Sequence, residues 1–178
     1  RSEIPPVQRA AAEAPGRLGD PKAVPALLGL GGSPLDRTLE HSVTYALIEI
    51  ADPVSTAAGL QATSSRARRA ALIALDQMEG GGLKAEAVIS LLDSSDPVLK
   101  ETAWWIAGDR PEWGSALAGF FKQGLCATSL TAAAREDLQQ KLVQSAENPA
   151  IQDLLAGMAE GNDRLIALRA MARTRAKG

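Results

Sequence analysis

The feature that most constrains the fold is an apolar pattern that recurs four times along the chain. Its copies start at positions 7, 39, 67 and 99, and the differences between successive starts are 32, 28 and 32. Counted from zero, positions 0, 4, 7 and 8 of each copy are mostly apolar and position 3 is small, which places them on one face of a helix. A period of roughly 30 residues leaves room for a second, shorter helix between copies. We therefore predict a solenoid of helical hairpins, each packed on its neighbours.

Helix-start signals lie between the copies. Asp caps the first turn of a helix, and Pro fits the first helical position. Such signals, with the glycine break at 80–82, predict short helices at 22–30, 54–60, 83–92 and 112–123. In the same way, longer helices are predicted to begin at Ser65, at Ser95-Asp96-Pro97 and at Ser129. The pattern weakens after Ser129, where we predict helices at 130–146, 149–159 and 163–173.

The composition agrees with packed helices and excludes several other classes. The 178 residues include 33 Ala and 23 Leu, which favour helices, and only six aromatic residues. No apolar run approaches the length of a membrane-spanning helix, so no membrane insertion is expected. A formal net charge of −2 gives no basic field for nucleic acids. One Cys and one His form neither an internal disulfide nor a zinc site made by protein ligands alone.

No residue cluster in the sequence predicts a reaction, and we predict no catalytic, cofactor-binding or metal-binding residue. The glycine stretches at 29–32 and 80–82 lack the spacing of a phosphate-binding loop and are expected to be helix ends and turns. His41 is expected to be an ordinary surface residue, because its position points away from the apolar face. Cys126 is expected to be a small buried apolar residue rather than a nucleophile.

Residues 11–28 (Ala-Ala-Glu-Ala-Pro-Gly-Arg-Leu-Gly-Asp-Pro-Lys-Ala-Val-Pro-Ala-Leu-Leu) resemble the HEAT-like repeat of the phycobiliprotein-lyase type. Two positions depart from that family, since Pro15 stands where Leu is usual and Glu40 where Arg is usual. Pro15 predicts that the first helix kinks or ends early.

This resemblance implies an all-α fold, an α-solenoid of about five HEAT-like helical hairpins in a right-handed superhelix. We expect a single HEAT-repeat domain over residues 1–178. Its parts are predicted to be regular repeats at about 5–125, degenerate capping repeats at about 126–173 and a frayed tail at 174–178.

Residues 39–53, 69–78 and 102–113 look like the HEAT-repeat segment of large exported bacterial proteins, with Trp-Trp-Ile-Ala at 104–107 as the most specific part. In that family a sugar-dehydrogenase-like β-propeller precedes the repeats and a c-type cytochrome domain follows them. The resemblance implies an extracytoplasmic (periplasmic) electron-transfer assembly, although the sequence itself does not fix the compartment. It gives this segment no haem, because haem attachment needs Cys-x-x-Cys-His and Cys126 stands alone. The chain begins at Arg1 without Met, so we also expect a segment of a longer protein.

In HEAT-like folds the second helix of each hairpin lines the concave side of the solenoid. On those helices the outward positions carry apolar as well as charged side chains, whereas a fully solvated ridge would be charged throughout. Mixed patches of this kind mark contact surfaces. We predict an interaction surface for another protein domain, formed by His41, Tyr45, Ile48, Arg69, Ile73, Glu101 and Trp105.

Five of the six aromatic residues fall between positions 104 and 121. Trp104 and Trp105 are adjacent, so on a helix they point about 100° apart and flank the apolar face on opposite sides. One interpretation wedges them between neighbouring repeats, with Trp113 and Phe120 or Phe121 closing the same core. The other places Trp105 on the interaction surface, and the sequence leaves both open.

Together these observations predict a non-enzymatic scaffold or protein-interaction module that orients a dehydrogenase-like domain and a cytochrome c domain. One alternative is a DNA alkylpurine glycosylase or nucleic-acid-binding module, since some HEAT-like enzymes of that type use Trp, Asp and Arg on the concave face. Here those residues would be Trp105, Asp76 and Arg69, but the charge balance disfavours nucleic acid. A second alternative, a pigment-binding or lyase-like module, is favoured only by the general repeat type.

Overall fold

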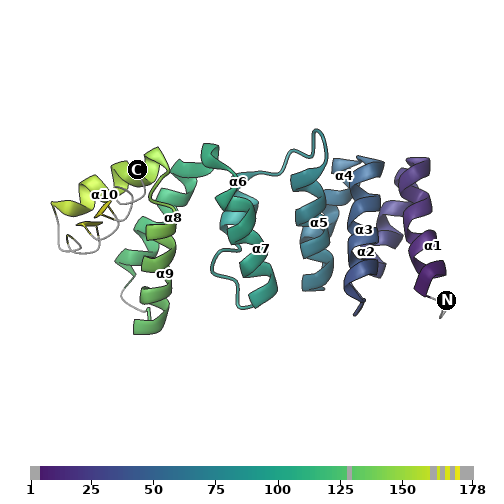
Figure 1. The fold of residues 1–178 in the computed structure, drawn as a ribbon, viewed down its shortest axis with the longest axis horizontal. Helices are drawn as coiled ribbons and strands as arrows, with labels where there is room; N and C mark the ends of the chain where they lie inside the picture. The colour runs from purple at the N-terminus through teal and green to yellow at the C-terminus, as the bar shows by residue number, and fades with distance from the viewer. Residues whose placement is uncertain (1–4, 128–129, 161–163, 165–166, 169–170, 173–178) are drawn as a thin grey trace. The chain divides into compact units, whose positions relative to one another are not determined.

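The computed structural model describes residues 5–127, 130–160, 164, 167–168 and 171–172. The described residues form helices and connecting turns, with no β-strand among them (Figure 1), and the prediction of an all-α chain is confirmed. None of the helices in this part of the chain is long and apolar enough to cross a membrane. The chain divides into two compact units, Arg1–Ile106 and Ala107–Gly178, and each is described by itself. The expectation of one continuous domain stays a prediction.

Unit 1 contains four longer helices that match the four copies of the apolar pattern. They are α1 (Pro5–Leu18), α3 (Arg37–Ile50), α5 (Ser65–Gln77) and α7 (Pro97–Gly108), the last of which runs just past the boundary of the unit. Each helix begins two residues before its copy of the pattern, so the helix starts keep the spacings of the copies. The spacing of the apolar pattern is therefore also the spacing of the helix starts.

Shorter elements connect these helices, as the start signals predict. They are η1 (Pro21–Ala23) with α2 (Val24–Gly31), α4 (Pro53–Ala57) with η2 (Ala58–Gln61), and α6 (Ala85–Ile89). The Asp side chains cap as expected: Asp20 accepts from the Lys22 amide at 3.1 Å, and Asp52 accepts from the Ser55 amide at 3.1 Å. Each cap satisfies a backbone donor that has no partner inside the helix.

The core of unit 1 lies between the longer helices α1, α3 and α5 and the shorter helix α2. α3 packs between α1 and α5, and α2 packs against both α3 and α5. Small residues let the helices approach closely: a Cβ added at Gly16 of α1 would lie 2.9 Å from the Cα of Ala46 on α3. The largest apolar residues of this core, all buried, are Val24, Leu27, Leu28, Leu39, Val43, Leu47, Ile50, Leu75 and Met78.

The first helix is predicted to kink or end early at Pro15, and the early end is wrong. α1 continues to Leu18 with Pro15 inside it. The carbonyl of Pro15 accepts from the Asp20 amide at 3.2 Å, and the carbonyl of Gly16 accepts from the Gly19 amide at 2.9 Å. These bonds, with the contact of Gly16 on α3, hold the last turn although Pro15 has no N–H to donate.

Unit 2 contains η3 (Pro111–Trp113), α8 (Gly114–Cys126), α9 (Ala132–Gln144) and α10 (Pro149–Ala159). α8 packs against α9 and α10, and Phe121, Leu142 and Ile151 are fully buried. The helices predicted at 130–146 and 149–159 are confirmed. The Ser129 start and most of the helix at 163–173 lie outside the described residues, as does the tail at 174–178.

Cys126 corrects another expectation, because the structure places it on the surface rather than in the core. It is the last residue of α8, and the inward position at this end of the helix belongs to its neighbour Leu125, which is buried. Adjacent helical residues point about 100° apart, so only one of the two reaches the core.

Candidate functional site

The outer faces of α3, α5 and α7 form a groove in unit 1. Two hollows of about 710 and 530 Å³ make up this groove, and they share Arg37, Glu40, Thr44 and Arg69. We call it the α3/α5/α7 groove. Its charged lobe lies at the first turns of the three helices, and its apolar lobe lies farther along them.

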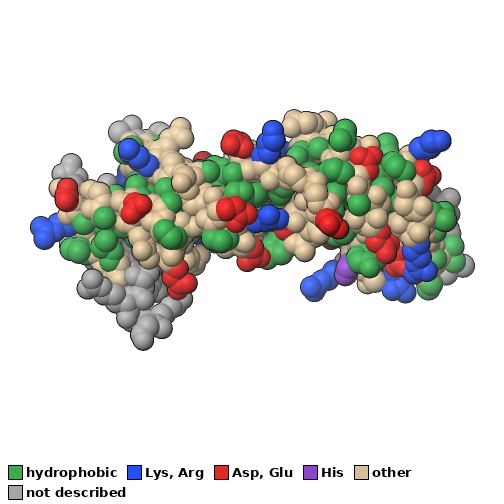
Figure 2. Space-filling model, turned by 90° about the horizontal axis from the view of Figure 1, so that it is seen from above, with side chains coloured by type: hydrophobic (Ala, Val, Ile, Leu, Met, Phe, Trp, Pro, Cys, Tyr) green, Lys and Arg blue, Asp and Glu red, His purple; other side chains and the backbone are tan. Residues whose placement is uncertain are grey.

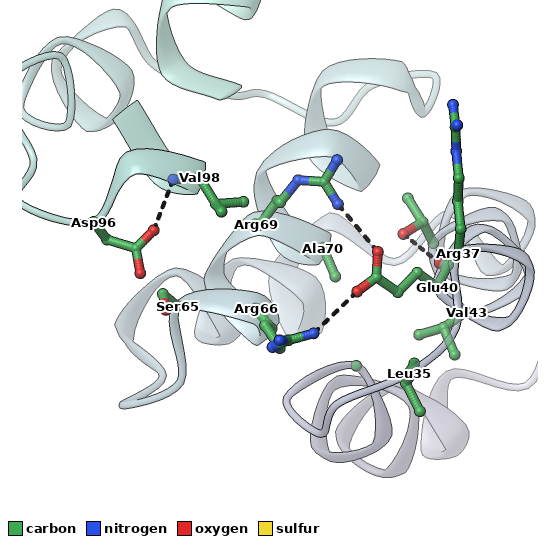
Figure 3. Close-up of a pocket in the computed structure, with 12 residues that line it drawn as sticks. Leu35, Arg37, Glu40, Val43, Ser65, Arg66, Arg69, Ala70, Asp96 and Val98 are labelled. Atoms are coloured by element: carbon green, nitrogen blue, oxygen red, sulfur yellow. Dashed lines mark hydrogen bonds and ion pairs between the residues drawn. The ribbon is translucent and has the colours of Figure 1, made fainter. Parts of the chain in front are cut away.

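The charged lobe is centred on Glu40, which binds two arginines of the neighbouring helix. Glu40 Oε1 lies 3.4 Å from a terminal nitrogen of Arg66, and Oε2 lies 3.6 Å from one of Arg69. Figure 3 shows both side chains reaching from α5 to Glu40 on α3, while Arg37 points away from it. Among the described residues, the guanidinium of Arg37 has no ion pair or hydrogen bond. The lobe therefore holds more basic than acidic side chains, with one arginine uncommitted.

Asp96 lines the same lobe, but its carboxylate is engaged in capping α7. It accepts from the amides of Val98 at 2.9 Å and Leu99 at 3.0 Å. A hydrogen bond from the Ser65 side chain, followed by the Leu99 amide, lowers the pKa of Asp96 below its usual value. Asp96 is therefore a carboxylate at neutral pH. Its oxygens accept hydrogen bonds from groups at the first turns of α5 and α7.

Aromatic and aliphatic side chains from all three helices form the apolar lobe. Tyr45 on α3 is 48% exposed and Trp105 on α7 is 47% exposed, while Ile48 and Ile73 are half-buried between them. His41 meets Tyr45 edge-on, with ring centroids 6.3 Å apart. Among the described residues, neither the hydroxyl of Tyr45 nor the indole nitrogen of Trp105 has a hydrogen-bond partner.

Six of the seven residues predicted for the interaction surface line this one groove. They are His41, Tyr45, Ile48, Arg69, Ile73 and Trp105. Glu101 is exposed on α7 but does not line it. The structure thus brings together residues that lie far apart in the sequence.

The two adjacent tryptophans take different roles. Trp104 is half-buried, and its indole N–H donates to the carbonyl of Leu92 at 3.1 Å. Trp105 turns the other way and lines the apolar lobe. The exposed interpretation therefore holds for Trp105, and the wedge between neighbouring repeats stays a prediction for Trp104.

Sequence reasoning missed Arg37 and Arg66, which complete the charged lobe. Arg37 lies two residues before the copy of the apolar pattern that starts at 39, and Arg66 lies one residue before the copy that starts at 67. The outward positions are counted from the start of each copy, which leaves both arginines out. The available signal was helical spacing, since Arg37 stands four residues before His41 and Arg66 three before Arg69.

The groove offers binding groups rather than a reactive constellation. Among the described residues, no cluster of three or more His, Cys, Asp or Glu side chains is arranged to hold a metal ion. Asp76, the third member of the glycosylase alternative, does not line the groove with Arg69 and Trp105, and it accepts from the Gln77 amide group at 2.6 Å. On the face shown in Figure 2, acidic and basic side chains are interspersed, with no broad area of a single charge.

Comparison with known proteins adds no identity to this geometry. No protein-family model matches the chain, and no curated protein matches its sequence. The function therefore has to be inferred from the groove.

Proposed function

We propose that this chain is a non-enzymatic helical-repeat scaffold that holds a segment of another protein or domain in the α3/α5/α7 groove. One observation carries the proposal: Tyr45 and Trp105 stand about half exposed in a groove that also contains Arg37, Arg66 and Arg69. Tyr, Trp and Arg are the residue types that dominate the binding energy of protein interfaces. The half-buried Ile48 and Ile73 supply the apolar floor that such anchors need.

The HEAT-like solenoid is part of this proposal. The regular spacing of α1, α3, α5 and α7, with a shorter element after each of the first three, supports a stack of hairpins in unit 1. In a stack of this kind, equivalent helices present their outer faces side by side. That arrangement accounts for a groove built from matching positions on successive helices.

The proposed partners are neighbouring domains, a dehydrogenase-like β-propeller and a c-type cytochrome. The sequence likeness at 39–53, 69–78 and 102–113 supports this choice, and so does the location of the groove on the same helices. The proposed role is geometric, namely to keep an electron donor and an acceptor in a fixed relation.

The proposal is tested by selecting random dodecapeptides displayed on phage against the full chain. Peptides that are enriched should bind the variant carrying both Ile73→Ser and Trp105→Ser at least about tenfold more weakly, a change of about 1.4 kcal/mol. The matched control carries Leu18→Ser and Val54→Ser, which remove apolar side chains that are 81% and 82% exposed outside the groove. The control should bind like the wild type.

Circular dichroism and thermal unfolding of both double variants accompany the binding measurement. If the groove variant fails to fold, its residues belong to the core and the proposal is wrong. Equal binding by wild type and groove variant, or the absence of any enriched peptide, also contradicts the proposal.

A further inference from the structure

We propose that the occupant of the α3/α5/α7 groove is an extended peptide segment with an acidic residue two to four positions from a large apolar residue. This inference rests on the proposed function and specifies the chemistry of what the groove binds. It follows from the charge of one lobe, the exposed aromatic side chains of the other and the distance between them.

The charged lobe is set up to accept a carboxylate from outside. Three arginines line it with two acids, although the whole chain has a net charge of −2. Asp96 is already bound to two backbone amides, so Glu40 alone faces Arg66 and Arg69. Its contacts of 3.4 and 3.6 Å are longer than the roughly 2.7–2.9 Å typical of charge-assisted hydrogen bonds. Each guanidinium carries five N–H donors, so both arginines keep donors for a second carboxylate.

Arg37 adds a guanidinium that no described residue occupies. It stands on the first turn of α3, beside Glu40 and pointing away from it (Figure 3). A carboxylate from a partner can pair with it in a bidentate manner without displacing any internal contact. Arg37 is therefore the residue whose removal should affect an acidic ligand most selectively.

The apolar lobe fits a large side chain together with peptide backbone. Ile48 and Ile73 form its floor, and the half-exposed rings of Tyr45 and Trp105 supply area for burial. The hydroxyl of Tyr45 and the indole N–H of Trp105 are donors without partners among the described residues. Backbone carbonyls of an extended segment would accept from them, which favours a peptide over a purely apolar ligand.

The separation of the lobes sets the spacing within the peptide. Along α3, eight residues separate Arg37 from Tyr45, which corresponds to about 12 Å of helix rise. Along α5, four residues separate Arg69 from Ile73, or about 6 Å. An extended peptide advances about 3.3 Å per residue, so about two to four residues span these distances.

A nucleic acid is a poorer fit to the same arginines. Glu40 and Asp96 lie in the charged lobe and would repel a chain of phosphates, whereas one or two carboxylates need only Arg37 and the free donors of Arg66 and Arg69. A single-stranded oligonucleotide therefore serves as the competing ligand in the test.

The test uses enriched peptides synthesised in pairs, one with its acidic residues and one with the corresponding amides. Fluorescence polarisation with the full chain should show the acidic member binding at least about fivefold more tightly, and the preference should shrink as NaCl is raised. In Arg37→Gln the preference should fall to less than about twofold. In Arg9→Gln, which alters an exposed arginine of α1 outside the groove, it should persist.

The outcomes separate this inference from the proposed function. If the peptides need Ile73 and Trp105 but bind equally well as acids and amides, the inference is wrong and the proposed function stands. If the preference survives Arg37→Gln, the carboxylate does not bind at Arg37, and the assignment of that residue as its binding site is wrong. Tighter binding of the oligonucleotide than of every peptide overturns the inference in favour of a polyanion. If binding does not depend on Ile73 and Trp105, both proposals fail.

Discussion

Unit 2 buries an aromatic ring in its core, whereas unit 1 keeps its aromatic rings out of its core and leaves two of them about half exposed. In unit 2, Phe121 is fully buried, Phe120 meets it edge-on with centroids 5.9 Å apart, and the half-buried Trp113 lies 5.5 Å from the Arg110 guanidinium. In unit 1, Tyr45 and Trp105 stand about half exposed, and the core is filled by aliphatic side chains.

This difference shows that the exposed rings of unit 1 are not forced outward by a lack of core-forming residues. Helices α1 to α5 bury Leu, Val, Ile and Ala at close approach, and that core is complete without Tyr45. Exposed aromatic residues that packing does not explain point to binding.

Phe121→Ala should produce the largest loss, about 3 to 5 kcal/mol of unfolding free energy, because it leaves a cavity in the core of unit 2. Phe120→Ala, at the half-buried neighbouring position, should cost clearly less. Urea denaturation followed by circular dichroism measures both variants. Equal losses would show that unit 2 does not rely on the inward ring.

Trp104→Phe should cost about 1 to 3 kcal/mol, because it removes the indole N–H that donates to Leu92 and leaves that carbonyl without its partner. Trp105→Phe keeps an aromatic ring in the groove and removes no hydrogen bond within the described residues, so it should change stability by less than about 0.5 kcal/mol. The midpoints of urea unfolding measure this contrast, provided that the two variants share the same dependence of the unfolding free energy on urea concentration. A reversed order would place Trp105 in the core.

Ala51→Gly should raise the stability of unit 1 by about 1 kcal/mol, because Ala51 ends α3 in a left-handed conformation that costs an L-residue energy and costs glycine almost none. Its φ is 51° and its ψ is 41°. Thermal unfolding should shift upward, with peptide binding unchanged. Ala58→Gly, at a right-handed position, should lower stability instead and serves as the control.

The capping carboxylate of Asp96 should make unit 1 sensitive to acid. Its folded pKa is lowered, chiefly by the hydrogen bond from Ser65, so its contribution is present above the unfolded pKa and is lost as the pH falls through the folded one. The loss should therefore appear below about pH 4. Asp96→Asn keeps a capping side chain and should flatten this part of the pH–stability curve, whereas Asp93→Asn, at an exposed position, should leave it in place.

The helices could be predicted from the sequence because their signals are local. The apolar pattern places the starts of α1, α3, α5 and α7 within two residues, and Asp20 and Asp52 mark the starts of shorter elements between them. Pro15 misled the prediction because tertiary contact and turn hydrogen bonds hold the last turn of α1. Cys126 misled it because Leu125, one residue away, takes the inward position.

Most of the groove could be predicted for the same reason, since its residues occupy equivalent positions on successive helices. The split between Trp104 and Trp105 could not, because either side of the apolar face suits an indole until the position of Leu92 is known. The charged lobe was missed because Arg66 becomes a neighbour of Glu40 only when α3 and α5 pack, whereas Arg37, on the same helix as Glu40, lies before the first position of the apolar pattern.

Hydrogen–deuterium exchange of the full chain, with and without the best acidic peptide at saturation, tests the central claim most directly. If the peptide binds in the groove, amide exchange should slow in α3, α5 and α7. The effect should be strongest in their first turns, where the free chain opens locally by fraying. No change is expected in α9 or α10. Protection confined to unit 2, or spread evenly over both units, would contradict the assignment of the groove as the binding surface.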